Sequence, residues 1–280
     1  MNFNKYKQLF LKKVDYLDSL KKNKYNLKYS NEYYFDMIFL MLNNVNTWFS
    51  LTYTKKYGCK RKIYKNHYRT INNKFNKWTK ECVFIQIFNE ITLKFNENTN
   101  NFLIDATSIY NKNGSECISY NPENYKKKVT KISMLTRTDG FIIDVQQFKM
   151  NREKEDKNKN KKPYKTFVHD VKMINDHLNS NNFKNIKNNS KYLKIIGDKA
   201  YKHKNIQINN KICIMVTPDK KNTLNKNSKH NNKKLKKRIK VEHNFLSLKK
   251  YERLILRKDK NINVFMSWVY IISSTFNLNF

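Results

Sequence analysis

Three acidic residues stand out for where they occur in the sequence. Asp105 and Asp198 each end a short apolar run, and Glu242 lies in a segment that is otherwise basic. A carboxylate beside apolar residues costs free energy unless it is paired, hydrogen-bonded or bound to a metal ion. Each acid also has an ordinary structural explanation, because Asp often ends a strand at a turn and Glu242 can pair with Arg238 one helical turn earlier. Their chemistry therefore depends on whether the fold brings them together.

The N-terminal region that precedes these acids has the spacing of a helical module. Residues 1–97 carry apolar residues at three-to-four spacing, which predicts helices. The segment 64–80 has one apolar and one basic stripe, as in the recognition helix of a helix-turn-helix, so this region is predicted to bind DNA. We expect Arg69 and Lys74 to contact DNA from that helix. A plain solvated helical face explains the basic stripe equally well.

Residues 98–280 contain all three acids and change to a mixed pattern. Asp139-Gly140 is a hairpin turn signal between two apolar runs. The predicted elements are strands at 102–107, 129–136 and 141–148, a helix at 168–178, strands at 192–198 and 211–216, and a helix at 235–251. This order predicts a mixed α/β domain. Two basic stretches near 151–165 and 219–234 have almost no apolar residues and are predicted to be exposed insertions.

The charge of the chain indicates its partner. The 58 Lys and Arg residues outnumber the 22 Asp and Glu residues, which gives a formal net charge of +36 over 280 residues. Nucleic acid is the commonest polyanion for such a chain. Hydrophobic residues make up 39% of the sequence, which is enough for a packed core and argues against a wholly disordered protein.

Other classes of protein fit the sequence poorly. No run approaches 18 uninterrupted apolar residues, so we expect no membrane-spanning segment. The N-terminus has no uncharged apolar core followed by a small-residue cleavage site, so we expect a protein that is not secreted. The four cysteines are isolated, which indicates reduced thiols rather than a zinc site or disulfides. We expect an intracellular location with DNA, in a nucleoid, a nucleus or a viral factory.

The three acidic segments, in this order, resemble the DDE transposases of bacterial insertion sequences, in particular insertion sequence families four and five. In that group the first Asp is followed by a small residue and Ser or Thr, as at 105–107. The second Asp lies in a Gly-Asp-Lys-x-Tyr motif, which 197–201 matches. The third acid is the helical Glu of a Y-x2-R-x3-E-x6-K pattern, met here at Arg238, Glu242 and Lys249. Leucine replaces the tyrosine of that pattern.

The resemblance implies a ribonuclease H-like catalytic domain over 98–280, preceded by the helical DNA-binding region at 1–97. It implies that Asp105, Asp198 and Glu242 are the catalytic residues and the metal ligands. Two Mg²⁺ ions would bind there, and Mn²⁺ can substitute. Hard oxygen ligands suit Mg²⁺, and two such ions can activate a nucleophile and stabilise a leaving oxygen in phosphodiester cleavage.

The resemblance also implies the partners. The substrate would be double-stranded DNA, both the terminal inverted repeats of a mobile element and the target DNA, with a homodimer holding two ends together. Arg238 and Lys249 are expected to clamp the DNA backbone beside the metal ions. Arg253 and Arg257 continue the basic track and are expected to contact phosphate without reading bases.

Two other functions remain open at this point. One is a catalytically silent DNA-binding protein derived from such a transposase. The three acids argue against it, because a protein that only binds DNA does not need acidic residues within a strongly basic sequence. The other is a ribonuclease H-like nuclease that cuts without joining strands. Nothing in the sequence separates nicking from strand transfer.

Overall fold

The computed structural model contains two compact units. The helical unit comprises Met1–Ile91 and Leu248–Phe280, and the sheet unit comprises Thr92–Ser247. The structure describes residues 2–21, 29–44, 48, 67–94, 99–121, 124–149, 170–186, 190–201, 206–208, 211–218, 233 and 235–280. The predicted insertion near 151–165 and all of 219–234 except Lys233 lie outside these residues. No helix among them is long and apolar enough to cross a membrane.

The division into units corrects the predicted boundary at residue 97. Residues 248–280 do not extend the catalytic domain as predicted, because they complete the core of the N-terminal helices. The elements of the helical unit are α1 (Phe3–Ser19), α2 (Asn31–Asn44), α3 (His67–Lys80), α4 (Val83–Lys94), α9 (Glu252–Ile255), β8 (Leu256–Arg257) and α10 (Ile262–Asn277). The helices predicted in this part of the chain are present, and binding of DNA by them stays a prediction.

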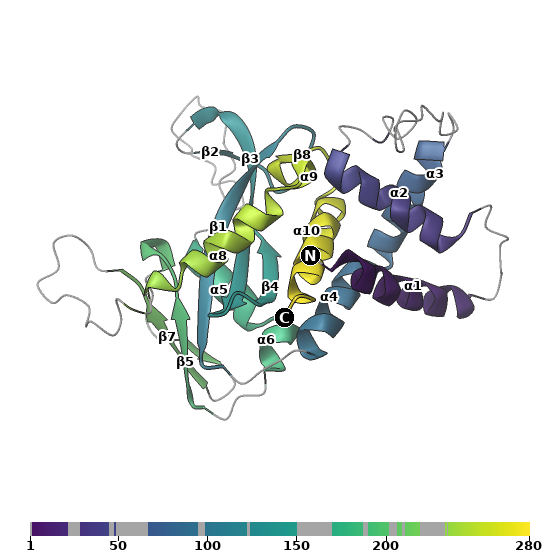
Figure 1. Ribbon diagram of the computed structural model, residues 1–280. Helices are drawn as coiled ribbons and strands as arrows, with labels where there is room; N and C mark the ends of the chain where they lie inside the picture. Colours follow the sequence, from purple (N-terminus) through teal and green to yellow (C-terminus); the bar gives the residue numbers. More distant parts are fainter. Residues whose placement is uncertain are drawn as a thin grey trace, which may run out of the picture. The chain divides into compact units, whose positions relative to one another are not determined.

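Aromatic side chains form the core of the helical unit. The rings of Phe75 on α3 and Trp268 on α10 stack with centroids 4.2 Å apart, and the rings of Phe10 and Trp78 meet edge to face at 4.8 Å. Most of α10 is buried, as expected for a helix that is apolar on all sides. The main-chain N–H of Asn2 donates to the carbonyl of Thr275, so α1 begins beside the end of α10 (Figure 1).

The sheet unit is a mixed α/β structure. Its strands are β1 (Asn101–Asn111), β2 (Ser119–Asn121), β3 (Asn124–Arg137), β4 (Ile142–Gln147), β5 (Tyr192–Ile196), β6 (Ile206–Ile208) and β7 (Lys211–Val216). They pair in the order β2-β3-β1-β5-β7-β6, with β4 paired to β3. Strands β1, β5 and β7 are parallel to one another, and β3 is antiparallel to β1 and β4. The strands predicted from apolar runs are therefore confirmed.

The hairpin between β3 and β4 forms at the predicted Asp139-Gly140 turn. Gly140 has a φ of 107°, a conformation that residues with a side chain rarely adopt. Asp139 Oδ1 accepts the main-chain N–H of Phe141 at 3.0 Å and also bonds the Arg137 side chain. The turn thus satisfies its own polar groups and fixes the register of the two strands.

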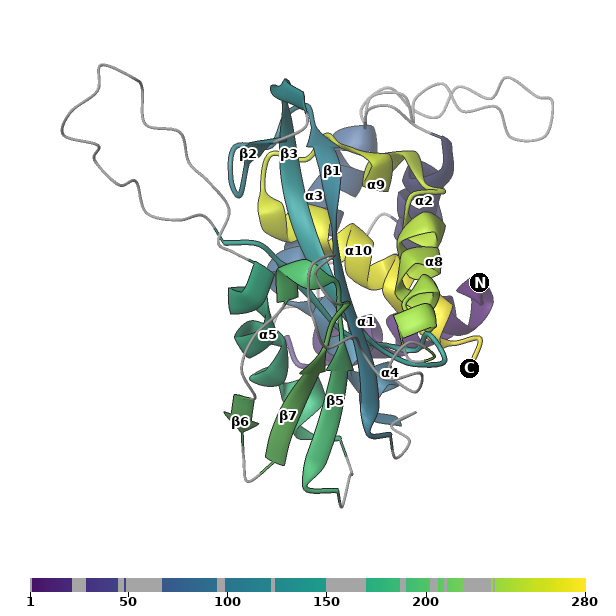
Figure 2. The same cartoon turned by 90° about the vertical axis from the view of Figure 1, so that its left-hand side faces the viewer.

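Helices lie on both faces of the sheet. The face that carries α5 (Asp170–Leu178) and α6 (Asn181–Lys184) buries a core that includes Phe102, Ile104, Leu135 and Ile174. The opposite face carries α8 (Ile239–Leu248), as Figure 2 shows. A short 3-10 helix, η2 (Lys199–Tyr201), follows β5 in the sequence.

The helix α8 is shorter than the predicted 235–251. The carbonyl of Leu248 accepts the main-chain N–H of Tyr251 at 3.2 Å, so a tight turn replaces further α-helical bonds. Asn244 anchors α8 to the β3–β4 turn by donating to the carbonyl of Gly140 at 2.8 Å. Lys249 therefore lies beyond the helix, and the predicted helical face shared by Arg238, Glu242 and Lys249 is wrong.

Candidate functional site

The sheet register places Asp105 and Asp198 next to each other. Strands β1 and β5 run parallel, with Leu103 opposite Ile196. Asp105 and Asp198 each come two residues after this pair, on β1 and directly beyond the end of β5. Clefts beyond the carboxyl ends of parallel strands are the usual place for ligands in open α/β sheets. The two acids singled out in the sequence thus lie at the same level of two neighbouring interior strands, where β5 ends and β1 continues.

The chain beyond β5 approaches β1 closely because residue 197 is glycine. A Cβ atom there would lie 3.0 Å from Ile104 Cγ2 and 3.1 Å from Tyr201 Cβ. Its main-chain N–H donates to Val216 on β7 at 3.1 Å. Asp198 then forms a turn in which its Oδ1 accepts the main-chain N–H of residue 200 at 2.8 Å. One oxygen of Asp198 is therefore held by the main chain.

The helix α8 brings the third acid and a cation to the same place. Arg238 Nη2, just before the helix, lies 3.6 Å from Asp105 Oδ2 and 3.8 Å from Glu242 Oε1. The Arg238 Nε atom is buried and has no hydrogen-bond partner. The Glu242 side chain is 53% exposed, whereas that of Asp105 is 16% exposed. Arg238 therefore lies between a shielded and an open carboxylate and satisfies neither at normal hydrogen-bond distance.

The electrostatics of Asp105 reflect this crowding. Burial raises the pKa of the Asp105 carboxyl above its ordinary value, and the nearby charges of Asp198 and Glu242 raise it further. The main-chain N–H of Ala106, 2.8 Å from Oδ1, and the Arg238 guanidinium act in the opposite direction. The three acids are thus close enough to influence one another, and a bound cation would relieve the cost of ionising Asp105.

The carboxylates suit a hard cation by their chemistry. Asp105 and Asp198 each have one oxygen bonded to a main-chain N–H, which orients the carboxyl group. Carboxylate oxygens are the protein ligands that Mg²⁺ prefers. In their present positions, no three acid, histidine or cysteine side chains of the described segments are grouped tightly enough to hold a metal ion. Arg238 occupies the space between Asp105 and Glu242 as their counter-charge.

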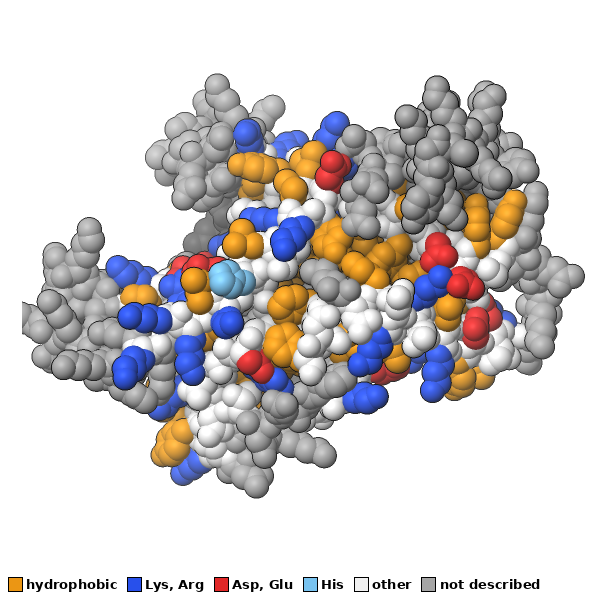
Figure 3. All heavy atoms as spheres, viewed as in Figure 1, with side chains coloured by type: hydrophobic (Ala, Val, Ile, Leu, Met, Phe, Trp, Pro, Cys, Tyr) orange, Lys and Arg blue, Asp and Glu red, His pale blue; other side chains and the backbone are white. Residues whose placement is uncertain are grey.

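Basic side chains surround this acidic cluster. Lys236 and Lys237, just before α8, and Lys240, in its first turn, are exposed. On the face shown in Figure 3, Lys and Arg side chains gather over α8. A polyanion that approached the cluster would therefore meet positive charge first.

Two of the predicted DNA-contacting residues are buried instead. Arg253 is 2% exposed and donates to Asp259 Oδ1 at 2.9 Å, with its guanidinium 5.5 Å from the Trp268 ring centroid. Arg257 is fully buried and donates to the carbonyls of Asp259 and Lys260 at 3.0 and 2.8 Å. These arginines hold the helical unit together, so the prediction that they contact phosphate is wrong.

The predictions for the other basic residues have different outcomes. Lys74 is 9% exposed, with its ammonium 5.1 Å from the Trp78 ring centroid, and burial lowers its pKa. Its predicted DNA contact is wrong, because the aliphatic stem packs into the helical core. Arg69 is exposed and donates to the Tyr68 hydroxyl at 3.2 Å. Lys249 is half-buried, and burial lowers its pKa. DNA contacts by Arg69 and Lys249 stay predictions.

The structure also shows a buried polar network that the sequence analysis did not identify. Asp144, His177 and Ser133 are joined by hydrogen bonds behind Asp105. The available signal was an acid inside the apolar strand at 141–148, where a carboxylate needs an internal partner.

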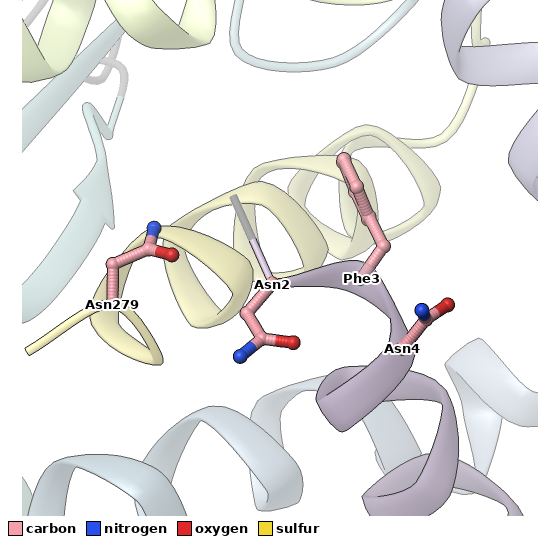
Figure 4. Close-up of a pocket in the computed structure, with 4 residues that line it drawn as sticks. All are labelled: Asn2, Phe3, Asn4 and Asn279. Carbon is pink, nitrogen blue, oxygen red and sulfur yellow. The ribbon is translucent and has the colours of Figure 1, made fainter.

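A shallow pocket of about 430 Å³ lies in the helical unit. It is lined by Asn2, Phe3, Asn4 and Asn279 (Figure 4). None of these side chains is a nucleophile, an acid or a base, so this pocket is not the candidate site.

Comparison with known proteins gives one distant similarity. No protein-family model and no curated protein matches the chain. A solved structure described as the cryo-EM structure of a piggyBac transposase synaptic complex with hairpin DNA aligns with it at 13% identity and a TM-score of 0.39. The alignment covers 78% of this chain and 49% of that chain. The chain thus spans about half the length of that protein.

Proposed function

We propose that this chain is a DDE-type DNA transposase, which binds element ends and catalyses DNA cleavage and strand transfer in a ribonuclease H-like domain. The observation that carries the proposal is the register of β1 and β5, which aligns Asp105 with Asp198 while α8 supplies Glu242. A chain of net charge +36 that keeps three acids near the carboxyl end of β5 is suited to a polyanionic substrate and a cationic cofactor.

The protein's own groups prepare the site in three ways. The N–H groups that bond Asp105 and Asp198 orient the two carboxylates and leave one oxygen of each for a ligand. Asp105, Asp198 and Glu242 would hold Mg²⁺, which would supply Lewis-acid activation of the nucleophile and stabilisation of the leaving oxygen. Arg238 balances the charge of the acids and can pair with a DNA phosphate once the carboxylates are engaged elsewhere.

The partners follow from the reaction. Double-stranded DNA provides both the element ends and the target, and holding two ends requires two copies of the chain. Exposed lysines at the start of α8 would contact the backbone phosphates, which fixes position but carries no sequence information.

The test uses DNA that carries the sequences flanking the gene. Cleavage and strand joining are measured with Mg²⁺ for the unmodified protein, for Glu242→Gln and for Glu252→Gln. Glu252 is an exposed acid on α9 and serves as the matched control. We expect loss of cleavage with DNA binding retained in Glu242→Gln, and near-normal cleavage in the control.

Each other outcome identifies a different function. Metal-dependent cleavage without joined products would indicate a nuclease. Binding of the ends without cleavage by the unmodified protein, with either Mg²⁺ or Mn²⁺, would contradict catalysis and leave a DNA-binding protein.

A further inference from the structure

A buried chain of hydrogen bonds leads to the main chain of Asp105. Asp144 on β4 and His177 on α5 are joined through Oδ2 and Nδ1 at 2.7 Å. His177 Nε2 lies 2.9 Å from the hydroxyl of Ser133 on β3, and that hydroxyl donates to the carbonyl of Asp105 at 3.2 Å. Ser133 and His177 are fully buried and Asp144 is 5% exposed. A substrate cannot reach this serine, so the three residues do not form a nucleophilic site.

Two groups of the network fix the direction of their bonds. A carbonyl oxygen only accepts, so the Ser133 hydroxyl donates its hydrogen to Asp105. The Asp144 carboxylate accepts, both from His177 Nδ1 and from the Gln146 amide at 2.9 Å. The ring of His177 thus links Asp144 to the Ser133 hydroxyl.

The network reaches Asp105 from the face of the sheet opposite its carboxyl group. On β1 and β3, Asp105 pairs with Met134 and Ala106 pairs with Ser133. Because neighbouring strand residues point to opposite faces, the Ser133 side chain lies on the face opposite the Asp105 carboxyl. The carboxyl meets Arg238, next to α8, while the carbonyl of the same residue is held through α5.

We propose that Asp144, His177 and Ser133 are positioning residues that hold the main chain of β1 at Asp105. Asp144 and His177 fix the Ser133 hydroxyl, and that hydroxyl bonds the carbonyl of Asp105. The inference rests on the proposed function, because the position of Asp105 matters for catalysis only if Asp105 binds the catalytic metal.

Several other ionisable groups lie on the elements around His177. Asp170 and Asp176, on α5 itself, form ion pairs with Lys131 on β3 and Lys149 after β4. Tyr201 on η2 is buried, which raises its pKa and keeps it neutral. Lys172, Lys184 and Lys199 are exposed on α5, α6 and η2. Among the described residues, Asp144 is the ionised side chain with a hydrogen bond to the His177 ring.

The positioning is tested by hydrogen exchange with two hydroxyl deletions on β3. Ser133→Ala removes the bond to Asp105. Thr136→Val is the matched control, because Thr136 is fully buried and its hydroxyl has no hydrogen-bond partner. We expect exchange at 105–107 about fivefold faster in Ser133→Ala and unchanged in the control. Equal exchange in the two variants would overturn the network.

The catalytic consequence is tested by Mg²⁺-dependent DNA cleavage. We expect Ser133→Ala to lower turnover about tenfold with unchanged DNA affinity, and Thr136→Val to cleave DNA at a near-normal rate. Normal cleavage by Ser133→Ala would overturn the positioning role. Absence of cleavage by the unmodified protein would instead overturn the proposed function, while the exchange result would stand.

Discussion

The two arginine–acid clusters of this protein differ in how closely and how deeply their charges are paired. In the helical unit, Arg253 and Asp259 form a 2.9 Å bond, both side chains are almost fully buried, and the guanidinium lies near a tryptophan ring. In the sheet unit, Arg238 lies 3.6 Å from Asp105 and 3.8 Å from Glu242, and the Glu242 side chain is 53% exposed.

The difference separates a structural cluster from one that can bind a ligand. A buried pair at hydrogen-bond distance is closed to solvent and to a ligand, and removing one member leaves a buried charge. The cluster around Arg238 combines long contacts with an exposed carboxylate, so its groups can change partners at little cost. Both arginines come from the same basic region of the sequence, yet of the two clusters only the one at Asp105 is suited to a metal ion and a phosphate.

The largest expected effect is that of Asp105→Asn on catalysis. We expect Mg²⁺-dependent cleavage to fall by at least about 10⁴-fold, because the variant loses a metal ligand. The same substitution should not lower the stability of the folded protein at neutral pH. The folded-state pKa of Asp105 is raised, chiefly by burial, so its ionised form costs stability at neutral pH.

The melting temperatures test this second expectation. The Asn variant should melt no lower than the unmodified protein at pH 7. This difference should shrink as the pH falls from the raised folded-state pKa of Asp105 toward the ordinary Asp value, and it should vanish below that value, where the folded and unfolded states both bind the proton. A lower melting temperature of the variant at pH 7 would show that Asp105 is a structural residue like Asp259.

A smaller effect distinguishes the two arginines. Arg253→Met should lower the free energy of unfolding by about 3–5 kcal/mol, because it leaves the Asp259 carboxylate buried without its partner. Arg238→Met should change it by no more than about 1 kcal/mol, because the ion-pair contacts are long and partly solvated. Urea denaturation of both variants measures the values. Equal destabilisation would remove the distinction between the clusters.

The smallest effect concerns the basic residues of α3. Arg69 is exposed and Lys74 is buried, so of these two residues Arg69 is the one accessible to a phosphate. Arg69→Gln should reduce the slope of log K against log salt for DNA binding by about 0.9. Lys74→Met should leave the slope unchanged. A slope that changes with Lys74 rather than Arg69 would mean that α3 rearranges on DNA.

The sequence predicted the strands that carry Asp105 and Asp198, because a run of apolar residues that ends in an acid is a local signal. It also predicted the hairpin, through its glycine. It could not predict that Arg253 and Arg257 are buried, because their partners are the acid and carbonyls of the turn at 259–260. In sequence they look like a continuation of the basic track. The Ser133–His177 bond was equally inaccessible, since it joins residues 44 positions apart.

The composition of the helical unit has a consequence for the order in which the protein folds during synthesis. Its N-terminal part ends at Ile91, whereas α10, which supplies Trp268 to its core, begins at Ile262. Translation proceeds at about 5–20 residues per second, so this core waits on the order of ten seconds for its last helix. The sheet unit, which is continuous in sequence, has all its residues first. On the ribosome, the apolar faces of α1 to α4 are therefore the surface that a chaperone would need to cover.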